Sequence, residues 1–154
     1  MLPVAISREN APHYVWGDNC DGWHLLQESN LSVIEERMPP GASEVRHFHT
    51  NAQQFFFILS GQAVMETNSE RILLLAGQGV AIPPRTRHQF RNHSEEPVRF
   101  LVISQPSSYG DRVTEWLRKN HLEEHSDVAR LTPHDRICCI NLRHEQQSKV
   151  RLVR

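Results

Sequence analysis

His47 and His49 have the residue type and the spacing of a metal-chelating pair on a β-strand. Side chains two residues apart on a strand point to the same face, so the two imidazoles project together while Arg46 and Phe48 point the other way. Imidazole is a good ligand for most first-row transition metals. The chain has 10 histidines, however, so a pair of this kind also arises by chance and does not establish a site alone.

A longer pattern surrounds this pair, and a second pattern follows it. The first consists of Gly41, His47, His49, Gln54 and Gly61. The second consists of Gly77, Pro83, His88 and Asn92. In order and separation these residues resemble the two sequence motifs of the cupin superfamily. The departures are Gln54, where the family usually has glutamate, and Arg85, where it usually has glycine.

This resemblance implies a fold, a cofactor and a ligand set. The fold would be an all-β double-stranded β-helix, the jelly-roll cupin barrel, whose interior binds one divalent transition metal: Fe, Mn, Ni, Zn or Cu. Carried over by position, the ligands would be His47, His49, Gln54 and His88. A metal-free barrel with packed or hydrogen-bonded histidines is the alternative, which Gln54 keeps open because an amide oxygen binds a cation less strongly than a carboxylate.

Gln54 also affects the expected chemistry. A neutral ligand set disfavours oxidation of M(II) to M(III) and favours a Lewis-acid role, such as polarising a carbonyl. We therefore expect a metal-dependent enzyme of the isomerase, epimerase or lyase type that acts on a small oxygenated substrate. The alternatives are an Fe-, Ni- or Cu-dependent dioxygenase, because three histidines also support oxygenases in this superfamily, and a non-catalytic cupin that binds a small ligand.

Five residues are candidates for lining a substrate pocket. Strand alternation points Phe56 and Phe90 to the same side as the ligands. Arg85 occupies a turn position where a positive φ costs a non-glycine residue on the order of 1 kcal/mol. Either the turn differs locally, or the arginine is tolerated because its side chain reaches an anionic substrate or the C-terminal tail. Trp23 and Arg37 come from the N-terminal part of the chain.

Two short segments bear on the substrate. "VWGD" and "YGD" faintly resemble parts of the cupin domain of type II phosphomannose isomerases. This resemblance favours a sugar-like substrate, or a hydroxy or keto acid.

Short strands must position these residues. Between Leu31 and Ser104 the chain breaks into short apolar or alternating runs that end at Gly, Pro, Asn or Ser, which is typical of an all-β sandwich or barrel. We expect an N-terminal arm over residues 1–30 that packs on the barrel, the cupin barrel over 31–104, and a C-terminal helix and tail over 105–154.

The C-terminal helix is predicted from helical spacing. Its apolar stripe consists of Val113, Trp116, Leu117 and His121, and Asp111 is placed as the N-cap.

Composition limits the partners and the compartment. A chain of 154 residues with a formal net charge of −1 has one sizeable core and no general attraction to nucleic acid or to a membrane. The start lacks a signal peptide, and Cys20, Cys138 and Cys139 form no disulfide framework, so we expect a cytoplasmic protein with reduced thiols. Jelly-roll edges with apolar cover from the arm and the helix favour a homodimer.

Overall fold

The computed structural model describes residues 3–114, which form two antiparallel β-sheets and contain no helix. The strands are β1 (His13–Trp16), β2 (Cys20–Gln27), β3 (Ser32–Met38), β4 (His47–His49), β5 (Gln53–Ser60), β6 (Gln62–Thr67), β7 (Arg71–Leu75), β8 (Gly79–Ile82), β9 (His88–Arg91), β10 (Val98–Gln105) and β11 (Arg112–Thr114). The larger sheet has the order β1-β2-β3-β10-β5-β8, and the smaller sheet has the order β11-β4-β9-β6-β7. The all-β prediction is confirmed.

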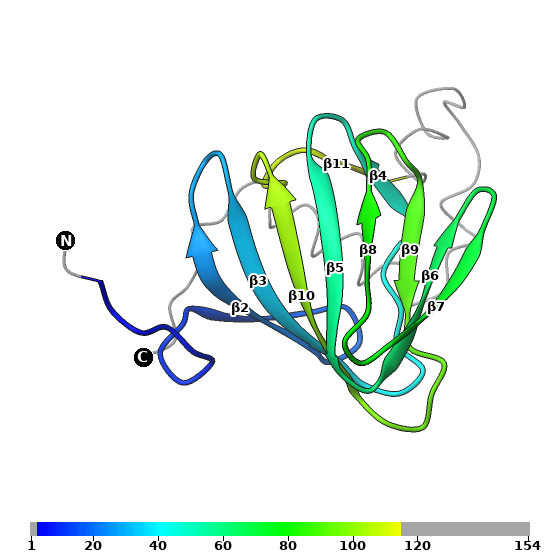
Figure 1. Ribbon diagram of the computed structural model, residues 1–154, viewed down its shortest axis with the longest axis horizontal. Helices are drawn as coiled ribbons and strands as arrows, with labels where there is room; N and C mark the ends of the chain where they lie inside the picture. The colour runs from blue at the N-terminus through cyan, green and yellow to red at the C-terminus, as the bar shows by residue number, and fades with distance from the viewer. Residues whose placement is uncertain (1–2, 115–154) are drawn as a thin grey trace, which may run out of the picture.

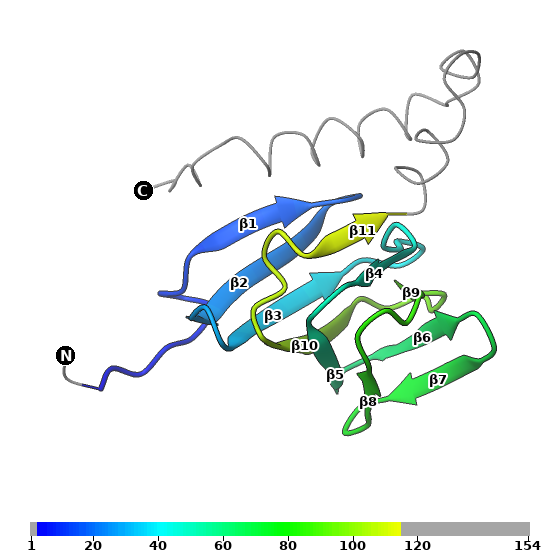
Figure 2. The same ribbon diagram turned by 90° about the horizontal axis from the view of Figure 1, so that it is seen from above.

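The chain crosses repeatedly between the two sheets, as in a jelly roll. After β3 in the larger sheet, β4 belongs to the smaller one, β5 to the larger, β6 and β7 to the smaller, β8 to the larger, β9 to the smaller and β10 to the larger. Figure 1 shows β2, β3, β10, β5 and β8 side by side, and Figure 2 shows the strands of the smaller sheet along the other side. Residues from both sheets therefore face one shared interior.

Stacked aromatic rings fill part of this interior. Phe56 of β5, Phe90 of β9 and Phe100 of β10 are each at most 1% exposed. The ring centroids of Phe56 and Phe90 are 5.3 Å apart, and those of Phe90 and Phe100 are 4.2 Å apart. The Phe56 ring also lies 5.9 Å from the ring of His88. The aromatic stack therefore forms an apolar layer directly beside the histidines.

Two positive-φ residues shape the ends of the strands. Gly61 joins β5 to β6 with φ of +79°, and a Cβ there would lie 2.7 Å from the carbonyl oxygen of Pro97, so the turn requires glycine. Arg85 has φ of +64°, which confirms the conformation expected at this position. Its backbone N–H donates to the carbonyl oxygen of His49 at 2.6 Å, and this bond fixes the turn before β9 against the end of β4.

Strands lie near both ends of the described chain. Towards the N-terminus, β1 is an edge strand of the larger sheet and β2 lies between β1 and β3. The expected helix start is wrong for Arg112–Thr114, which form β11 and pair with β4. Asp111 is not its N-cap, because its carboxylate accepts hydrogen bonds from the turn after β4. The remainder of the predicted helix and the tail lie outside the described residues, and the three segment boundaries remain predictions.

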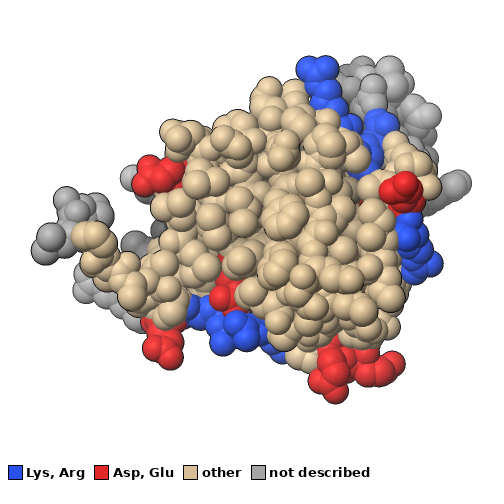
Figure 3. All heavy atoms as spheres, viewed as in Figure 1, with Lys and Arg blue, Asp and Glu red and all other residues tan. Residues whose placement is uncertain are grey.

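The centre of the outer face of the larger sheet carries few charges. Figure 3 shows that Lys, Arg, Asp and Glu lie mainly at the margin of this face. Phe55 and Leu59 of β5 are each 37% exposed on it. An exposed apolar sheet face is compatible with the homodimer expected from the sequence, which remains a prediction. Within residues 3–114, no helix has the length and apolar character needed to cross a bilayer.

Candidate metal centre

His47, His49 and His88 form a buried cluster between the two sheets. One potential ligand nitrogen from each residue lies within 4.8 Å of the other two. Alternation along β4 places His47 and His49 on the same face, and His47 pairs directly with His88 in the β4–β9 register. Their exposed fractions are 1%, 5% and 1%, respectively. The three imidazoles predicted to act together are therefore brought together and could hold a metal ion.

Backbone carbonyl groups set the tautomers of two of these rings. The Nδ1 of His47 lies 2.7 Å from the carbonyl oxygen of Val45, and the Nδ1 of His88 lies 2.8 Å from that of Thr86. A carbonyl oxygen only accepts, so each Nδ1 carries the proton and each Nε2 keeps its lone pair. The Nε2 of His88 is buried and has no hydrogen-bond partner. This arrangement is the one that metal-ligating histidines use.

Gln54 faces the same interior from β5. Its side chain is buried, whereas the neighbouring Gln53 is exposed, as alternation along β5 requires. The Nε2 of Gln54 donates to the Oγ of Ser104 at 3.2 Å, and Ser104 is its partner in the β5–β10 register. The Oε1 of Gln54 is buried and has no hydrogen-bond partner. A buried acceptor without a donor is costly, and a cation would satisfy it.

Burial keeps the imidazoles neutral. Desolvation lowers the pKa of His47 well below its ordinary value, lowers the pKa of His49 to about 4, and lowers the pKa of His88. The Arg112 guanidinium is the next contribution that lowers the pKa of His47 and of His49. Neutral imidazole is the form that binds a metal, so the rings are ready for ligation near pH 7.

Asp111 holds the turn that joins β4 to β5. Its carboxylate accepts hydrogen bonds from the backbone N–H groups of Thr50, Asn51 and Ala52 at 3.2, 2.9 and 2.8 Å. Desolvation opposes ionisation of Asp111, but the bonds from Ala52 and Asn51 outweigh it and lower the pKa of the carboxyl. The turn lies between His49 and Gln54, so Asp111 fixes the path of the chain between two predicted ligands.

Arg112 was not predicted from the sequence, although it lies beside the cluster. In the β11–β4 register it pairs with His49, which puts its side chain on the inner face. Its Nη2 lies 3.2 Å from the carbonyl oxygen of Val45 and 3.0 Å from the Nδ1 of His47. No sequence motif marks Arg112. Only the pairing of β11 with the distant strand β4 shows that its side chain lies beside the histidines.

Three of the predicted pocket residues lie near the histidines or on the elements that carry them. Phe56 and Phe90 belong to the aromatic stack, which leaves them in the interior next to His88. Arg85 lies in the turn before β9, where its side chain is exposed.

Trp23 and Arg37 lie on the outer face of the larger sheet, and the structure does not bring them together with the histidines. Glu36 pairs with the core residue Phe100, so Arg37, one residue further on, points the other way. Arg37 donates to the carboxylate of Asp21 at 3.2 Å. Trp23 lies on the same outer face, where the centroid of its ring is 5.5 Å from the guanidinium carbon of Arg8.

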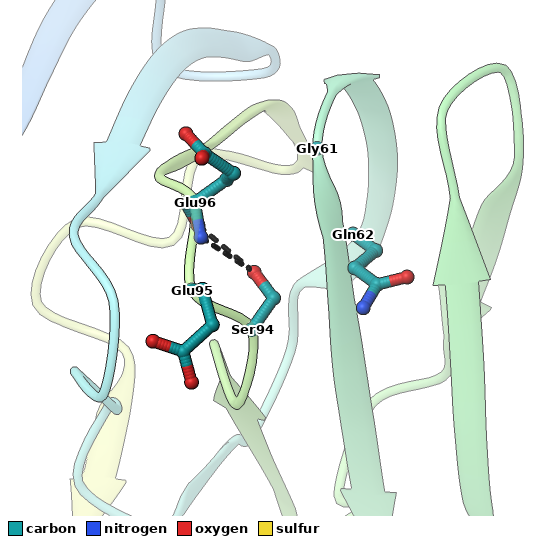
Figure 4. A pocket seen from close by; sticks show the side chains of 5 residues that line it. All are labelled: Gly61, Gln62, Ser94, Glu95 and Glu96. Atoms are coloured by element: carbon teal, nitrogen blue, oxygen red, sulfur yellow. Dashed lines mark hydrogen bonds between the residues drawn. The ribbon is translucent and has the colours of Figure 1, made fainter.

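A shallow pocket of about 420 Å³ lies at the other end of the barrel. Figure 4 shows its lining, which consists of Gly61, Gln62, Ser94, Glu95 and Glu96. These residues follow the C-terminal ends of β5 and β9, whereas Gln54 and His88 lie at the N-terminal ends of the same strands. The pocket contains none of the predicted ligands and is separate from the histidine cluster.

The metal-free protein is expected to lose stability as the pH falls from about 6.5 to about 4. Because the pKa of His49 is about 4 when folded and 6.5 when unfolded, the unfolded state binds more protons across this range. The free energy of unfolding therefore falls with pH, by about 3 kcal/mol from His49 alone at 1.36 kcal/mol per pKa unit, and does not depend on His49 above this range. Urea denaturation in EDTA at several pH values measures it. A His49→Gln variant with an equally steep dependence would contradict this origin.

Comparisons with known proteins agree with this architecture. Residues 34–104 match the family model described as the cupin domain. An uncharacterized protein of Methanocaldococcus jannaschii is 30% identical over 75 residues, which are 49% of this chain and 60% of that protein. This chain thus spans less than two thirds of that relative's length.

Solved structures of the same fold are also similar. A sugar phosphate isomerase of the cupin superfamily from Silicibacter pomeroyi has a TM-score of 0.60 at 22% identity, covering 68% of this chain and 76% of that one. A predicted oxalate decarboxylase from Thermotoga maritima has a TM-score of 0.62 at 17% identity, covering 68% and 100%. At these identities the likeness establishes the fold alone. Together with the family match and the crossing order of the strands, it shows that the described residues have the double-stranded β-helix fold of cupins, with residues 34–104 matching the cupin domain.

Proposed function

We propose that this protein is a metal-dependent cupin enzyme that acts on a small oxygenated substrate by isomerase, epimerase or lyase chemistry. The proposal rests on one observation: nitrogen and oxygen atoms inside the barrel have lone pairs that no described donor group contacts. Three buried imidazoles lie together, and the buried Nε2 of His88 and Oε1 of Gln54 lack hydrogen-bond partners among residues 3–114. Buried polar groups are rarely left in this state unless a ligand, water or ion completes them.

The donor set fits a divalent transition metal. His47, His49 and His88 would supply nitrogen and Gln54 an amide oxygen, which suits Fe, Mn, Ni, Zn or Cu. A bound ion of this kind would supply Lewis-acid chemistry, because it polarises a carbonyl or hydroxyl oxygen of the substrate.

The surrounding residues support such a site. The carbonyl groups of Val45 and Thr86 orient two imidazoles, and Ser104 orients the Gln54 amide. The aromatic rings of Phe56 and Phe90 exclude water from the adjacent interior. The ligand set has no carboxylate, so the histidines and Gln54 leave the full charge of the ion available to an oxygen of the substrate.

Metal content is the first test. Protein purified without a metal-affinity tag is expected to contain a divalent transition metal, or to take up one equivalent after dialysis, as measured by plasma mass spectrometry. His49→Ala should lose the metal, whereas Gln54→Glu should retain it more tightly because a carboxylate adds an attractive charge. Wild type that cannot be loaded, beside a Gln54→Glu variant that can, would overturn the proposal and favour a ligand-binding cupin.

The reaction class is tested on the loaded protein. Aldoses, ketoses, 2-hydroxy acids and 2-keto acids are incubated in deuterated water, and the hydrogen next to the carbonyl or hydroxyl carbon is followed by NMR. Exchange or isomerisation that is lost in His49→Ala supports the proposal. Oxygen consumption without exchange would overturn it in favour of a dioxygenase.

A further inference from the structure

Arg112 places a positive charge next to the candidate metal centre. Its guanidinium contacts the carbonyl oxygen of Val45 and the Nδ1 of His47. Because the Nδ1 of His47 already donates to Val45, it cannot accept a hydrogen bond from the guanidinium. The Nε of Arg112 is buried and has no hydrogen-bond partner. The cation therefore lies against the cluster, and no acidic side chain in the part of the chain that the structure describes pairs with it.

The acidic side chains near the cluster are engaged elsewhere. Among residues 3–114, no carboxylate forms an ion pair with Arg112. The carboxylate of Asp111 accepts hydrogen bonds from the backbone N–H groups of the turn after β4. Glu44, the other acid whose charge reaches the histidines, accepts from the backbone N–H of Phe90 at 3.3 Å.

The charges around the cluster favour an anion. Three neutral imidazoles and a neutral amide would leave a divalent cation with its full charge, and the half-buried Arg112 adds a further positive charge beside the buried histidines. Glu44 and Asp111 offset part of this charge from their own positions, but neither occupies a ligand position. An anionic oxygen placed directly on the cation would neutralise the centre most effectively.

We infer that the substrate is an α-oxygenated carboxylate, a 2-hydroxy or 2-keto acid, and that Arg112 is a specificity-determining residue that favours this anion. The inference rests on the proposed function. A carboxylate next to a hydroxyl or carbonyl brings its charge and a second oxygen to the same cation, whereas the phosphate of a sugar phosphate lies further from the reacting oxygens. A neutral sugar has no negative charge that could offset the positive charges of the metal ion and of Arg112.

Isothermal titration of the zinc-loaded protein with glycolate and with glycolamide tests the inference. The two compounds have nearly the same shape and differ in charge. We expect glycolate to bind at least tenfold more tightly. Arg112→Gln should reduce this preference at least severalfold and should also tighten the binding of zinc, because it removes a repelling charge. Arg112→Lys should keep most of the preference, and Arg99→Gln, on the outer face beside Glu35, should change neither quantity.

The outcomes separate the two proposals. If the wild-type protein bound neither zinc nor iron, manganese, nickel or copper, the proposed function would fail and this inference with it. If zinc bound but glycolate showed no advantage over glycolamide, or if Arg112→Gln kept the full advantage, the inference alone would fail. A purely structural role for Arg112 predicts weaker zinc binding in both Arg112 variants, and this result would also overturn it.

Discussion

The His88→Ala variant is expected to bind zinc about a hundredfold more weakly than the wild-type protein, or worse. His88 supplies a buried Nε2 without a protein partner, and alanine leaves no donor in its place. Structural zinc sites with four ligands contribute roughly 10–16 kcal/mol, so one ligand accounts for about 3 kcal/mol. Each 1.4 kcal/mol corresponds to about a tenfold change in the dissociation constant. Competition with a chelator of known zinc affinity at pH 7.5 measures the effect.

His93→Ala is the matched control for this experiment. His93 lies five residues further along the same segment but is exposed on the connection between β9 and β10. Its replacement should leave the zinc dissociation constant unchanged within about twofold. A His88→Ala variant that retained affinity within about threefold of wild type, with an intact thermal transition, would show that the cluster does not bind zinc through His88.

The positions of the candidate ligands could be predicted because they depend on local rules. His47 and His49 share a strand, so alternation alone puts them on one face. Gln54 and Gln53 are adjacent in β5, and the rule assigns one to the interior and the other to solvent, as the structure shows. Only the meeting of β4 with β9 required knowledge of the fold, which the spacing of the two motifs supplied.

The remaining site residues depend on long-range pairing. The faces of β2 and β3 are set by their registers with each other and with β10, and a register irregularity in β2 lies between His24 and Leu26. No motif residue in these strands gave a reference for inside and outside, so Trp23 and Arg37 could not be assigned to a face. Arg112 depends on a three-residue strand that pairs with β4 more than 60 residues earlier in the chain.

The predicted helix start at Asp111 shows how tertiary contacts override a local signal. Aspartate favours the N-cap position because its carboxylate accepts from free backbone N–H groups. In this fold the same carboxylate accepts from the amides of Asn51 and Ala52 instead. The local preference for binding backbone amides was satisfied by a distant turn, and the next three residues joined β4 as a strand.

The Phe90→Ala variant is expected to lower the free energy of unfolding by about 3–5 kcal/mol, the range for phenylalanine removed from a core. Phe90 is 0% exposed and packs against both Phe56 and Phe100, so alanine leaves a cavity between the two sheets. Rings held from strands of both sheets cannot collapse into such a cavity without shifting a sheet. Urea denaturation of the metal-free protein at pH 7.5 measures the loss.

Phe55→Ala is the control of equal size. Phe55 lies on the outer face of β5 and is 37% exposed, so its removal should cost less than half as much as the removal of Phe90. Phe90 also lies two residues from His88 on β9, and the cavity would loosen the strand that carries this ligand. We therefore expect Phe90→Ala, unlike Phe55→Ala, to weaken zinc binding severalfold as well. Equal losses of stability in the two variants would contradict the role of the aromatic stack as the support of the candidate metal centre.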